Sequence, residues 1–127
     1  MGMQLPTGEP AIRTIAMPAD TNPAGDIFGG WVLAQMDIAA GIVAYMRAQG
    51  RVATVAIDAM SFHQPVLVGD IVSCYADVVR IGRTSMVMHV EAWAKRVRTG
   101  EEIKVTEAKF TFVAIDDDRK PRLVRPA

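Results

Sequence analysis

The stretch Trp31-Val-Leu-Ala-Gln-Met-Asp-Ile-Ala-Ala-Gly-Ile-Val-Ala-Tyr-Met-Arg-Ala48 decides the fold of this protein. It contains no proline, and Gln35 and Asp37 are its only polar side chains before Tyr45. A helix that is apolar almost all round is typical of the interior of a protein. The sequence therefore predicts one long buried helix over residues 31–48, which Gly50 helps to end.

The segments around this helix predict an antiparallel sheet. A short strand over Ile12–Met17 and a turn-rich loop over Pro18–Asp26 come before the helix. Long strands are predicted after it over residues 51–63, 71–81, 84–97 and 104–115. Short turns between consecutive strands favour an antiparallel meander. The predicted class is α+β, with a strongly curved antiparallel sheet wrapped around one long central helix.

One face of one sheet cannot cover a helix that is apolar on all sides. The other side of the helix needs a second cover. A second copy of the same chain, related by a two-fold axis, would provide it. We therefore expect a homodimer at minimum.

Composition limits the classes of function. The chain has 127 residues, which suits one domain, and a formal net charge of zero, which points to no nucleic-acid or membrane partner. The apolar stretch Trp31–Met46 is expected to be too short for a membrane span, and the first residues are not expected to form a signal peptide. Cys74 is the only cysteine, so no internal disulfide can form. A cytoplasmic location is expected.

Asp37 is the one acid on the predicted helix. Helical spacing places it on one face with four small residues, Gly30, Ala34, Gly41 and Ala44. One interpretation is close packing of this face against backbone, with Asp37 hydrogen-bonded to a neighbour. The other is a groove that admits a substrate on which Asp37 acts, because an acid in an apolar helix costs several kcal/mol unless it is satisfied.

Gly29 and Gly30 stand at the expected helix start. The first N–H groups of a helix have no internal partner, and glycines allow a ligand oxygen to approach them. The pair could form an oxyanion site for an acyl carbonyl, or could serve only the backbone geometry of the helix entry. Gly29 and Asp37 are eight residues apart, about 12 Å along a helix axis. A catalytic site that uses both groups would therefore be shared between two antiparallel helices of a dimer.

The run Met17–Asp37 resembles the opening of the hotdog-fold acyl-CoA thioesterases, most closely those of the bacterial YciA type. The resemblance covers residues 10–118 and continues through Val52–Ile57, Pro65–Asp70, Val79–Ser85 and Phe110–Ile115. It implies a single hotdog domain over residues 10–118, a curved sheet around one helix, and dimers that join as a trimer of dimers.

The resemblance also implies roles for particular residues. The catalytic acid of the family falls on Asp37, its loop asparagine on Asn22, and its helix-start glycine on Gly30, with Gly29 beside it. The acid and the asparagine act from opposite partners in related enzymes. The Gly82–Ser85 turn, with Arg83, Thr84 and Ser85, matches a region near the nucleotide end of coenzyme A. We expect no metal and no cofactor.

The expected reaction is hydrolysis of short- to medium-chain acyl-CoA to the free acid and coenzyme A. The carbonyl oxygen would accept from the N–H groups of Gly29 and Gly30, and Asn22 would orient the water or the carbonyl. Asp37 would act as general base on water or as nucleophile, and the sequence leaves both open.

Two other functions on the same fold are less favoured. A hotdog dehydratase or hydratase would need a histidine near the helix, and none precedes Phe62. A non-catalytic acyl-CoA sensor should lack the acid or carry a DNA-binding segment.

Other polar residues are expected to be structural. His63 and His89 lie on predicted strands without metal-like spacing, Cys74 is expected in the core, and Asp116–Asp118 at a solvated strand end. Two pairs are interpreted as sheet-face packing or as the lining of an acyl channel, namely Met86 with Met88 and Phe110 with Phe112.

Overall fold

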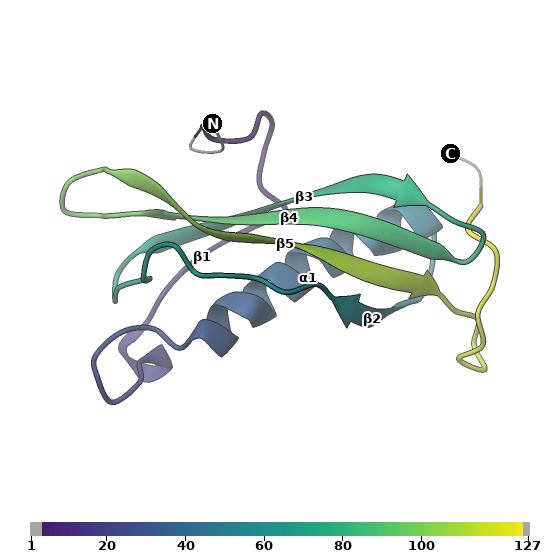
Figure 1. Cartoon of the computed structure of the whole chain (residues 1–127), viewed down its shortest axis with the longest axis horizontal. Helices are drawn as coiled ribbons and strands as arrows, with labels where there is room; N and C mark the ends of the chain where they lie inside the picture. Colours follow the sequence, from purple (N-terminus) through teal and green to yellow (C-terminus); the bar gives the residue numbers. More distant parts are fainter. Residues whose placement is uncertain (1–3, 126–127) are drawn as a thin grey trace.

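The computed structural model describes residues 4–125. The elements, in chain order, are β1 (Ile12–Ile15), the short 3-10 helix η1 (Pro18–Asp20), α1 (Gly29–Ala48), β2 (Val52–Ile57), β3 (Ile71–Ile81), β4 (Ser85–Lys95) and β5 (Glu102–Ala114). One long helix lies along a curved sheet (Figure 1). The α+β hotdog architecture expected from the sequence is confirmed.

The five strands form one antiparallel sheet in the order β1-β3-β4-β5-β2. The predicted meander is confirmed for β3, β4 and β5, which follow one another through short hairpins. It is wrong for β2, which pairs with β5 and forms an edge of the sheet instead of lying beside β3. Residues 58–70 carry the chain from that edge back to β3, a connection that a pattern of alternating residues does not reveal.

The strand predicted over residues 51–63 is shorter than expected. β2 ends at Ile57, although the chain continues beside β5. The Asp58 N–H donates to the Lys109 carbonyl at 2.9 Å, and the His63 N–H donates to the Val105 carbonyl at 2.8 Å. The six residues 58–63 thus lie opposite the five residues 105–109, so the regular ladder is lost between these two hydrogen bonds.

The core lies between α1 and the inner face of the sheet. α1 contacts all five strands, which is possible because the sheet curves around it. The alternation predicted for β4 is confirmed on the inner side, where Met86, Met88, Val90 and Ala92 are fully buried. A register shift follows Ala92, and the side chain of Trp93 is also buried.

α1 is buried on one side only. Its buried positions are Val32, Met36, Ala39, Ala40, Ala44 and Ala48. On its other side, Ile38 is 52% exposed, Tyr45 54% and Met46 72%. The subunit therefore leaves an apolar helix face uncovered, as expected for a helix that needs a second cover.

The apolar stretch Trp31–Met46 was expected to be too short for a membrane span, but the helix that contains it is longer than that stretch. α1 has 20 residues and by length and composition alone could cross a membrane. A helix in the core of a protein meets the same criterion, and α1 packs against the sheet along its length.

Candidate functional site

At the start of α1, the backbone N–H groups of Gly29 and Gly30 have no acceptor among residues 4–125. Phe28 precedes the helix and its side chain makes no capping hydrogen bond. Gly29 and Gly30 are exposed, and a Cβ built on Gly30 would meet nothing within 4 Å. A Cβ on Gly29 would lie 3.3 Å from the Phe62 ring. The Gly30 backbone can therefore be approached closely, as an oxyanion site requires, while Gly29 makes room for Phe62.

Asn22 holds the loop before the helix in a fixed shape. Its Oδ1 accepts from the Ala24 N–H at 2.9 Å and from the Asp26 N–H at 3.1 Å. Its own N–H donates to the Asp26 carbonyl at 2.7 Å. The side-chain oxygen is thus used within the loop. The Nδ2 amide group has no protein partner among residues 4–125, so it is the end of Asn22 that can donate to a substrate.

Asn22 and Gly29 share one pocket of about 300 Å³. Its other walls come from Val32 and from the Phe62–Val66 segment, together with Asp26 and Ile27. The Ile27 N–H donates to the Val66 carbonyl at 3.1 Å, which joins the helix entry to that segment. The predicted helix-start site and the predicted loop asparagine are therefore brought together in one subunit.

Asp37 does not line this pocket. It lies two turns along α1, where its Oδ1 accepts a 2.7 Å hydrogen bond from the Thr54 hydroxyl on β2. Its side chain is partly exposed, on the side of the helix that meets the free edge strand. Eight residues separate it from Gly29, about 12 Å along the axis. One subunit thus keeps the acid and the helix start apart, as the spacing predicted.

The small-residue face around Asp37 is only partly open. Gly30 and Ala34 are exposed, but Gly41 packs near the Phe112 ring and Ala44 is fully buried. The first half of this face is therefore open to a ligand, and the second half is helix-to-sheet packing.

The predicted nucleotide-contact residues lie at the far end of the molecule from the helix start. Arg83 and Thr84 form the β3–β4 turn with Gly82, and Ser85 begins β4. Figure 1 shows this turn near the C-terminal end of α1. One subunit does not bring Arg83, Thr84 or Ser85 to the pocket of Asn22 and Gly29.

His63 is a pocket residue that the sequence pattern missed. It was expected on a strand, but it lies after β2 in the irregular segment beside Asn22 and Gly29. The absence of a histidine before Phe62 in the sequence therefore did not exclude one near the start of α1, because His63 lies there in the fold. Only the proximity of Pro65 in sequence hinted that the strand ended before His63.

The remaining candidates are structural, as expected. Burial raises the pKa of the Cys74 thiol to about 12, which suits a core residue and not a nucleophile. The Met86, Met88, Phe110 and Phe112 side chains are at most 2% exposed, so they form core packing and no open channel.

His89 belongs to a cluster that the sequence spacing did not predict. Ligand-type atoms of His89, Glu91 and Glu107 lie within 4.8 Å of one another. Lys104 Nζ lies 3.0 Å from a Glu107 oxygen, His89 Nε2 lies 2.9 Å from the other, and Trp93 Nε1 donates to Glu91 at 2.9 Å. The buried ammonium already supplies the positive charge, so the cluster is an ion-pair network on the outer face of the sheet.

Comparison with known proteins shows which family the chain matches. The model of the thioesterase superfamily matches residues 24–101. The chain is 52% identical over 120 residues to the acyl-CoA thioester hydrolase YciA of Salmonella typhimurium, covering 92% of this chain and 90% of that protein.

Solved structures agree with the sequence match. The chain is similar to the hexameric thioesterase y2039 from Yersinia pestis, with a TM-score of 0.91 and 52% identity over 97% of this chain and 100% of that one. It is also similar to HI0827, described as a hexameric broad specificity acyl-coenzyme A thioesterase. That similarity has a TM-score of 0.91 and 45% identity over 97% of this chain and 85% of that one.

Proposed function

The chain belongs to the thioesterase superfamily and is an acyl-CoA thioester hydrolase, and we propose that its active site forms between two subunits. The observation that carries this proposal is the separation of the two halves of the site. Asn22 and Gly29 line one pocket, and Asp37 of the same subunit lies outside it. Two antiparallel helices would place Asp37 of each subunit beside the helix start of the other.

The uncovered surface beside Asp37 supports this pairing. The exposed apolar side of α1 adjoins β2, which is an edge strand of the sheet. Val55 on β2 is 56% exposed and Ile42 on α1 is 42% exposed. An apolar helix face next to a free strand edge is the kind of surface that a second copy covers, because it buries apolar area and pairs backbone groups together.

The chemistry follows from the groups that meet at this interface. The thioester carbonyl oxygen accepts from the helix-start N–H groups, with Gly30 open to it, and the Asn22 Nδ2 group donates to the carbonyl or to the attacking water. As the carbonyl carbon is attacked, negative charge grows on its oxygen and these donors stabilise it. Collapse of the tetrahedral intermediate breaks the C–S bond, and the thiolate of coenzyme A leaves and takes up a proton.

Asp37 has two possible parts in this reaction. As a general base it takes a proton from water, and the resulting hydroxide attacks the carbonyl carbon. As a nucleophile it forms an acyl anhydride, which water then hydrolyses. A single turnover in H₂¹⁸O that labels Asp37 and leaves the first acid released unlabelled identifies the nucleophilic route, through attack of water on the aspartyl carbonyl of the anhydride.

The acyl chain has limited space inside the subunit. The inner face of the sheet is filled by buried side chains, so the chain must lie along the interface and not beneath α1. Short- to medium-chain acyl-CoAs are the substrates that we propose. The family resemblance further supports a nucleotide contact at Arg83, Thr84 and Ser85 of the Gly82–Ser85 turn.

The proposal also covers the oligomeric state, the domain bounds and the location of the enzyme. Its relatives with solved structures are described as hexameric, and we infer the same trimer of dimers here. We infer one domain over residues 10–118. A lone buried thiol suits the reducing cytoplasm.

Mixing two inactive variants tests the shared site. Asp37→Ala removes the acid. Asn22→Asp removes the Nδ2 donor but keeps the oxygen that accepts from Ala24 and Asp26. Each variant alone should lose nearly all turnover of a short acyl-CoA while remaining folded by circular dichroism. After co-expression, roughly a quarter of wild-type turnover should return, because half of randomly paired dimers are mixed and each holds one intact site.

The mixed sample has a matched control. Asp37→Ala carried together with Asn22→Asp in one chain and co-expressed with wild type separates a shared site from a site within one subunit. In a shared site, both sites of a mixed dimer lack one of the two groups, so only the quarter of dimers that pair two wild-type chains is active and about a quarter of wild-type turnover remains, whereas a site within one subunit would leave about half. Absence of any recovery in the first mixture, with mixed dimers verified by mass spectrometry, would overturn the shared site. Full turnover by Asp37→Ala alone would overturn the role of the acid.

A further inference from the structure

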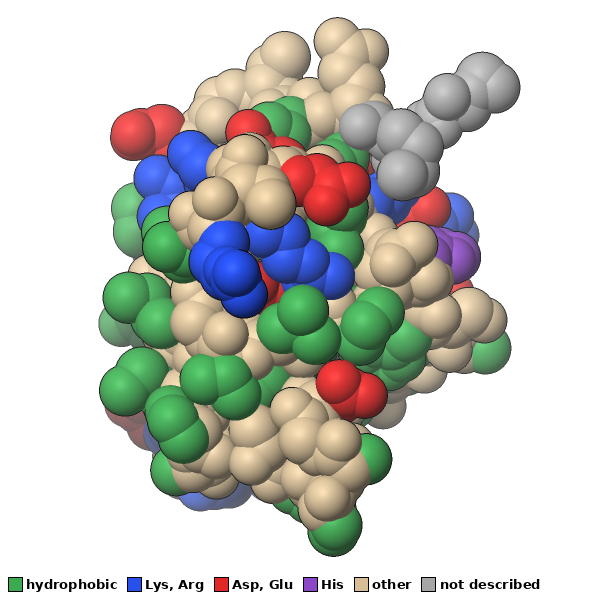
Figure 2. All heavy atoms as spheres, turned by 90° about the vertical axis from the view of Figure 1, so that its left-hand side faces the viewer, with side chains coloured by type: hydrophobic (Ala, Val, Ile, Leu, Met, Phe, Trp, Pro, Cys, Tyr) green, Lys and Arg blue, Asp and Glu red, His purple; other side chains and the backbone are tan. Residues whose placement is uncertain are grey.

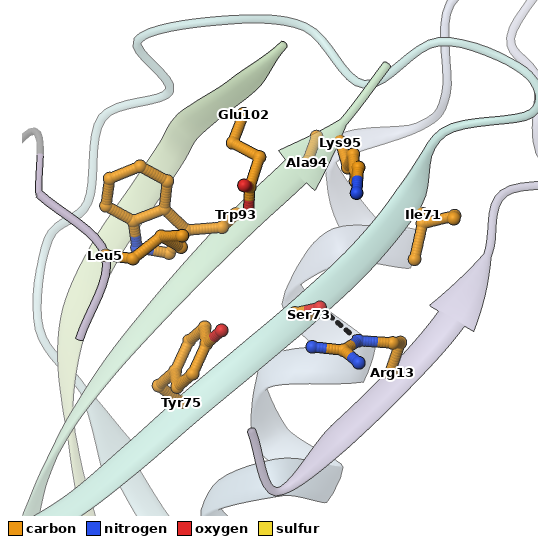
Figure 3. Close-up of a pocket in the computed structure, with 9 residues that line it drawn as sticks. All are labelled: Leu5, Arg13, Ile71, Ser73, Tyr75, Trp93, Ala94, Lys95 and Glu102. Atoms are coloured by element: carbon orange, nitrogen blue, oxygen red, sulfur yellow. Dashed lines mark hydrogen bonds between the residues drawn. The ribbon is translucent and has the colours of Figure 1, made fainter. Parts of the chain in front are cut away.

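A second pocket lies on the outer face of the sheet, away from α1. It has a volume of about 160 Å³ and is walled by β1, β3, β4 and the start of β5, with Leu5 at its rim (Figure 3). None of the residues placed in the active site lines it. The pocket is therefore separate from the site of hydrolysis.

One wall of this pocket is a positioned guanidinium group. Arg13 on β1 pairs in register with Ser73 on β3, and its Nε donates to the Ser73 Oγ at 2.9 Å. That hydrogen bond orients the guanidinium group of this exposed residue. Its two terminal nitrogens have no protein partner among residues 4–125. A fork with two free N–H groups side by side suits a carboxylate or phosphate group.

Tyr75, two residues after Ser73 on β3, brings a hydroxyl group to the pocket. Tyr75 is only 9% exposed, and its hydroxyl points toward the space that Arg13 and Ser73 border (Figure 3). It forms no hydrogen bond with the part of the chain that the structure describes. Ser73, 8% exposed, keeps its own O–H free to donate, since its oxygen accepts from Arg13.

The charge around this space is positive. Lys95 and Glu102 pair across β4 and β5 at the upper border of the pocket, and both point into it (Figure 3). Arg13 adds a second cation, so two positive groups face one negative group. The Trp93 ring forms the apolar side. The donors and the net charge favour an anion over a cation.

We propose that this outer-face pocket binds a small oxyanion, a carboxylate or a phosphate group, through Arg13, Tyr75 and Ser73. The guanidinium group holds two oxygens, and the two hydroxyl groups donate to the remaining lone pairs. Lys95 adds attraction at the entrance. The proposal does not depend on the shared active site, because no residue belongs to both.

Fluorine NMR on the intact protein tests this proposal. The chain has two tryptophans, Trp31 on α1 and Trp93 in the pocket, and 5-fluorotryptophan gives each a signal that a Trp31→Phe variant assigns. Sodium phosphate and sodium acetate are titrated separately, with sodium chloride holding the ionic strength constant. The Trp93 signal should shift to saturation with at least one of the two ions, and the Trp31 signal should not follow the same curve.

Variants connect the signal to the proposed donors. Arg13→Gln should abolish the saturable shift, and Tyr75→Phe should weaken binding about 10- to 100-fold, as expected for loss of one hydrogen bond to a charged group. Arg80 is an exposed arginine on β3, the strand that carries Tyr75, and lies outside the pocket. Arg80→Gln should therefore leave binding unchanged.

The two ions distinguish the source of the anion. Saturation by acetate alone identifies a carboxylate site, saturation by phosphate alone identifies a phosphate site, and saturation by both identifies a general oxyanion site. No saturable Trp93 shift with either ion up to about 50 mM, where any site of useful affinity is filled, would overturn the proposal. Retention of the shift in Arg13→Gln would overturn it as well.

Discussion

The Thr54 hydroxyl donates a 2.7 Å hydrogen bond to the Asp37 carboxylate and so ties the edge strand β2 to the middle of α1. Thr54 stands where the register of β2 against β5 shifts, between Thr54 and Ala56. The hydrogen bond orients one carboxylate oxygen, and the other has no hydrogen-bond partner within residues 4–125. The acid is thus oriented at the surface where we place the second subunit.

Removing this hydrogen bond should slow turnover without removing it. Thr54→Val keeps the side-chain shape but leaves Asp37 without its donor, and kcat should fall about 10-fold, because a hydrogen bond to a charged group contributes roughly 1.5–3 kcal/mol. Thr54→Ser should keep most of the activity. Steady-state kinetics on one short acyl-CoA measures both. Equal kcat for wild type and Thr54→Val would show that the hydrogen bond does not orient the acid for catalysis.

Arg96 and Asp70 should together hold in place the segment around Pro65, which forms a wall of the pocket of Asn22 and Gly29. Arg96 Nη1 pairs with Asp70 Oδ2, and Nη2 donates to the Pro65 carbonyl at 3.1 Å. Both side chains are largely buried, and Asp70 also accepts from the Leu67 N–H at 2.8 Å. The pair lies beside a pocket of about 630 Å³ at the β4–β5 hairpin end, the face with clustered basic side chains in Figure 2.

Arg96→Gln should destabilise the fold by about 2–4 kcal/mol, because it leaves the Asp70 carboxylate buried and without its cation. Urea unfolding measures the loss. Asp70→Asn in the same chain should restore part of it, since no buried charge then remains, and the double-mutant cycle should give a coupling of about 1–3 kcal/mol. Arg98→Gln on the same exposed hairpin is the matched control and should change stability by less than about 0.5 kcal/mol. Additive effects of the two single changes would contradict a direct interaction.

A charge on the uncovered side of α1 should separate the subunits. Met46 is 72% exposed in the single subunit, so Met46→Glu does not disturb the core. If this face meets a second copy, the carboxylate would be buried without a partner, and both assembly and turnover should be lost. Light scattering coupled to gel filtration measures the mass. Val97→Glu, at a 64% exposed apolar residue on the hairpin, tests whether any new surface charge has the same effect on the dimer. An unchanged dimer in Met46→Glu would contradict the proposed interface.

The Cys74 thiol should make stability depend on pH in the alkaline range. Burial raises its pKa from the ordinary 9.0 to about 12. The unfolded chain therefore releases the proton between about pH 9 and 12 while the folded chain keeps it, so the free energy of unfolding falls with rising pH in that window. Each pH unit there costs up to about 1.4 kcal/mol. Cys74→Ala should show a shallower decline in urea unfolding series. Parallel declines in the two proteins would rule out this contribution.

Glu107 should contribute stability that acid removes. Its hydrogen bond with Lys104, followed by the one with His89, lowers the pKa of Glu107 below 4.5. The contribution is present above the unfolded pKa and is lost as pH falls through the lowered folded value. Glu107→Gln leaves the buried Lys104 with a weaker partner and should cost about 1 kcal/mol at pH 7, since Glu107 itself is partly exposed. The difference from wild type should shrink below pH 4. A constant difference from pH 7 to pH 3 would contradict the linkage.

The order and type of the elements followed from local patterns in the sequence. The apolar stretch of α1 and the alternation in β4 each depend on periodicity, and both were confirmed. The distance between Gly29 and Asp37 along the helix followed from their eight-residue spacing alone, because the rise per residue of an α-helix is fixed.

Contacts between residues far apart in sequence were decided only by the tertiary structure. β2 joins β5 and not β3, His63 reaches the helix start, and Thr54 finds Asp37, and no local period encodes any of these pairings. They depend on how the sheet curves and on how residues 58–70 return along its edge. Sequence determined which groups the chain carries and how far apart one helix holds them, while packing decided which of them meet.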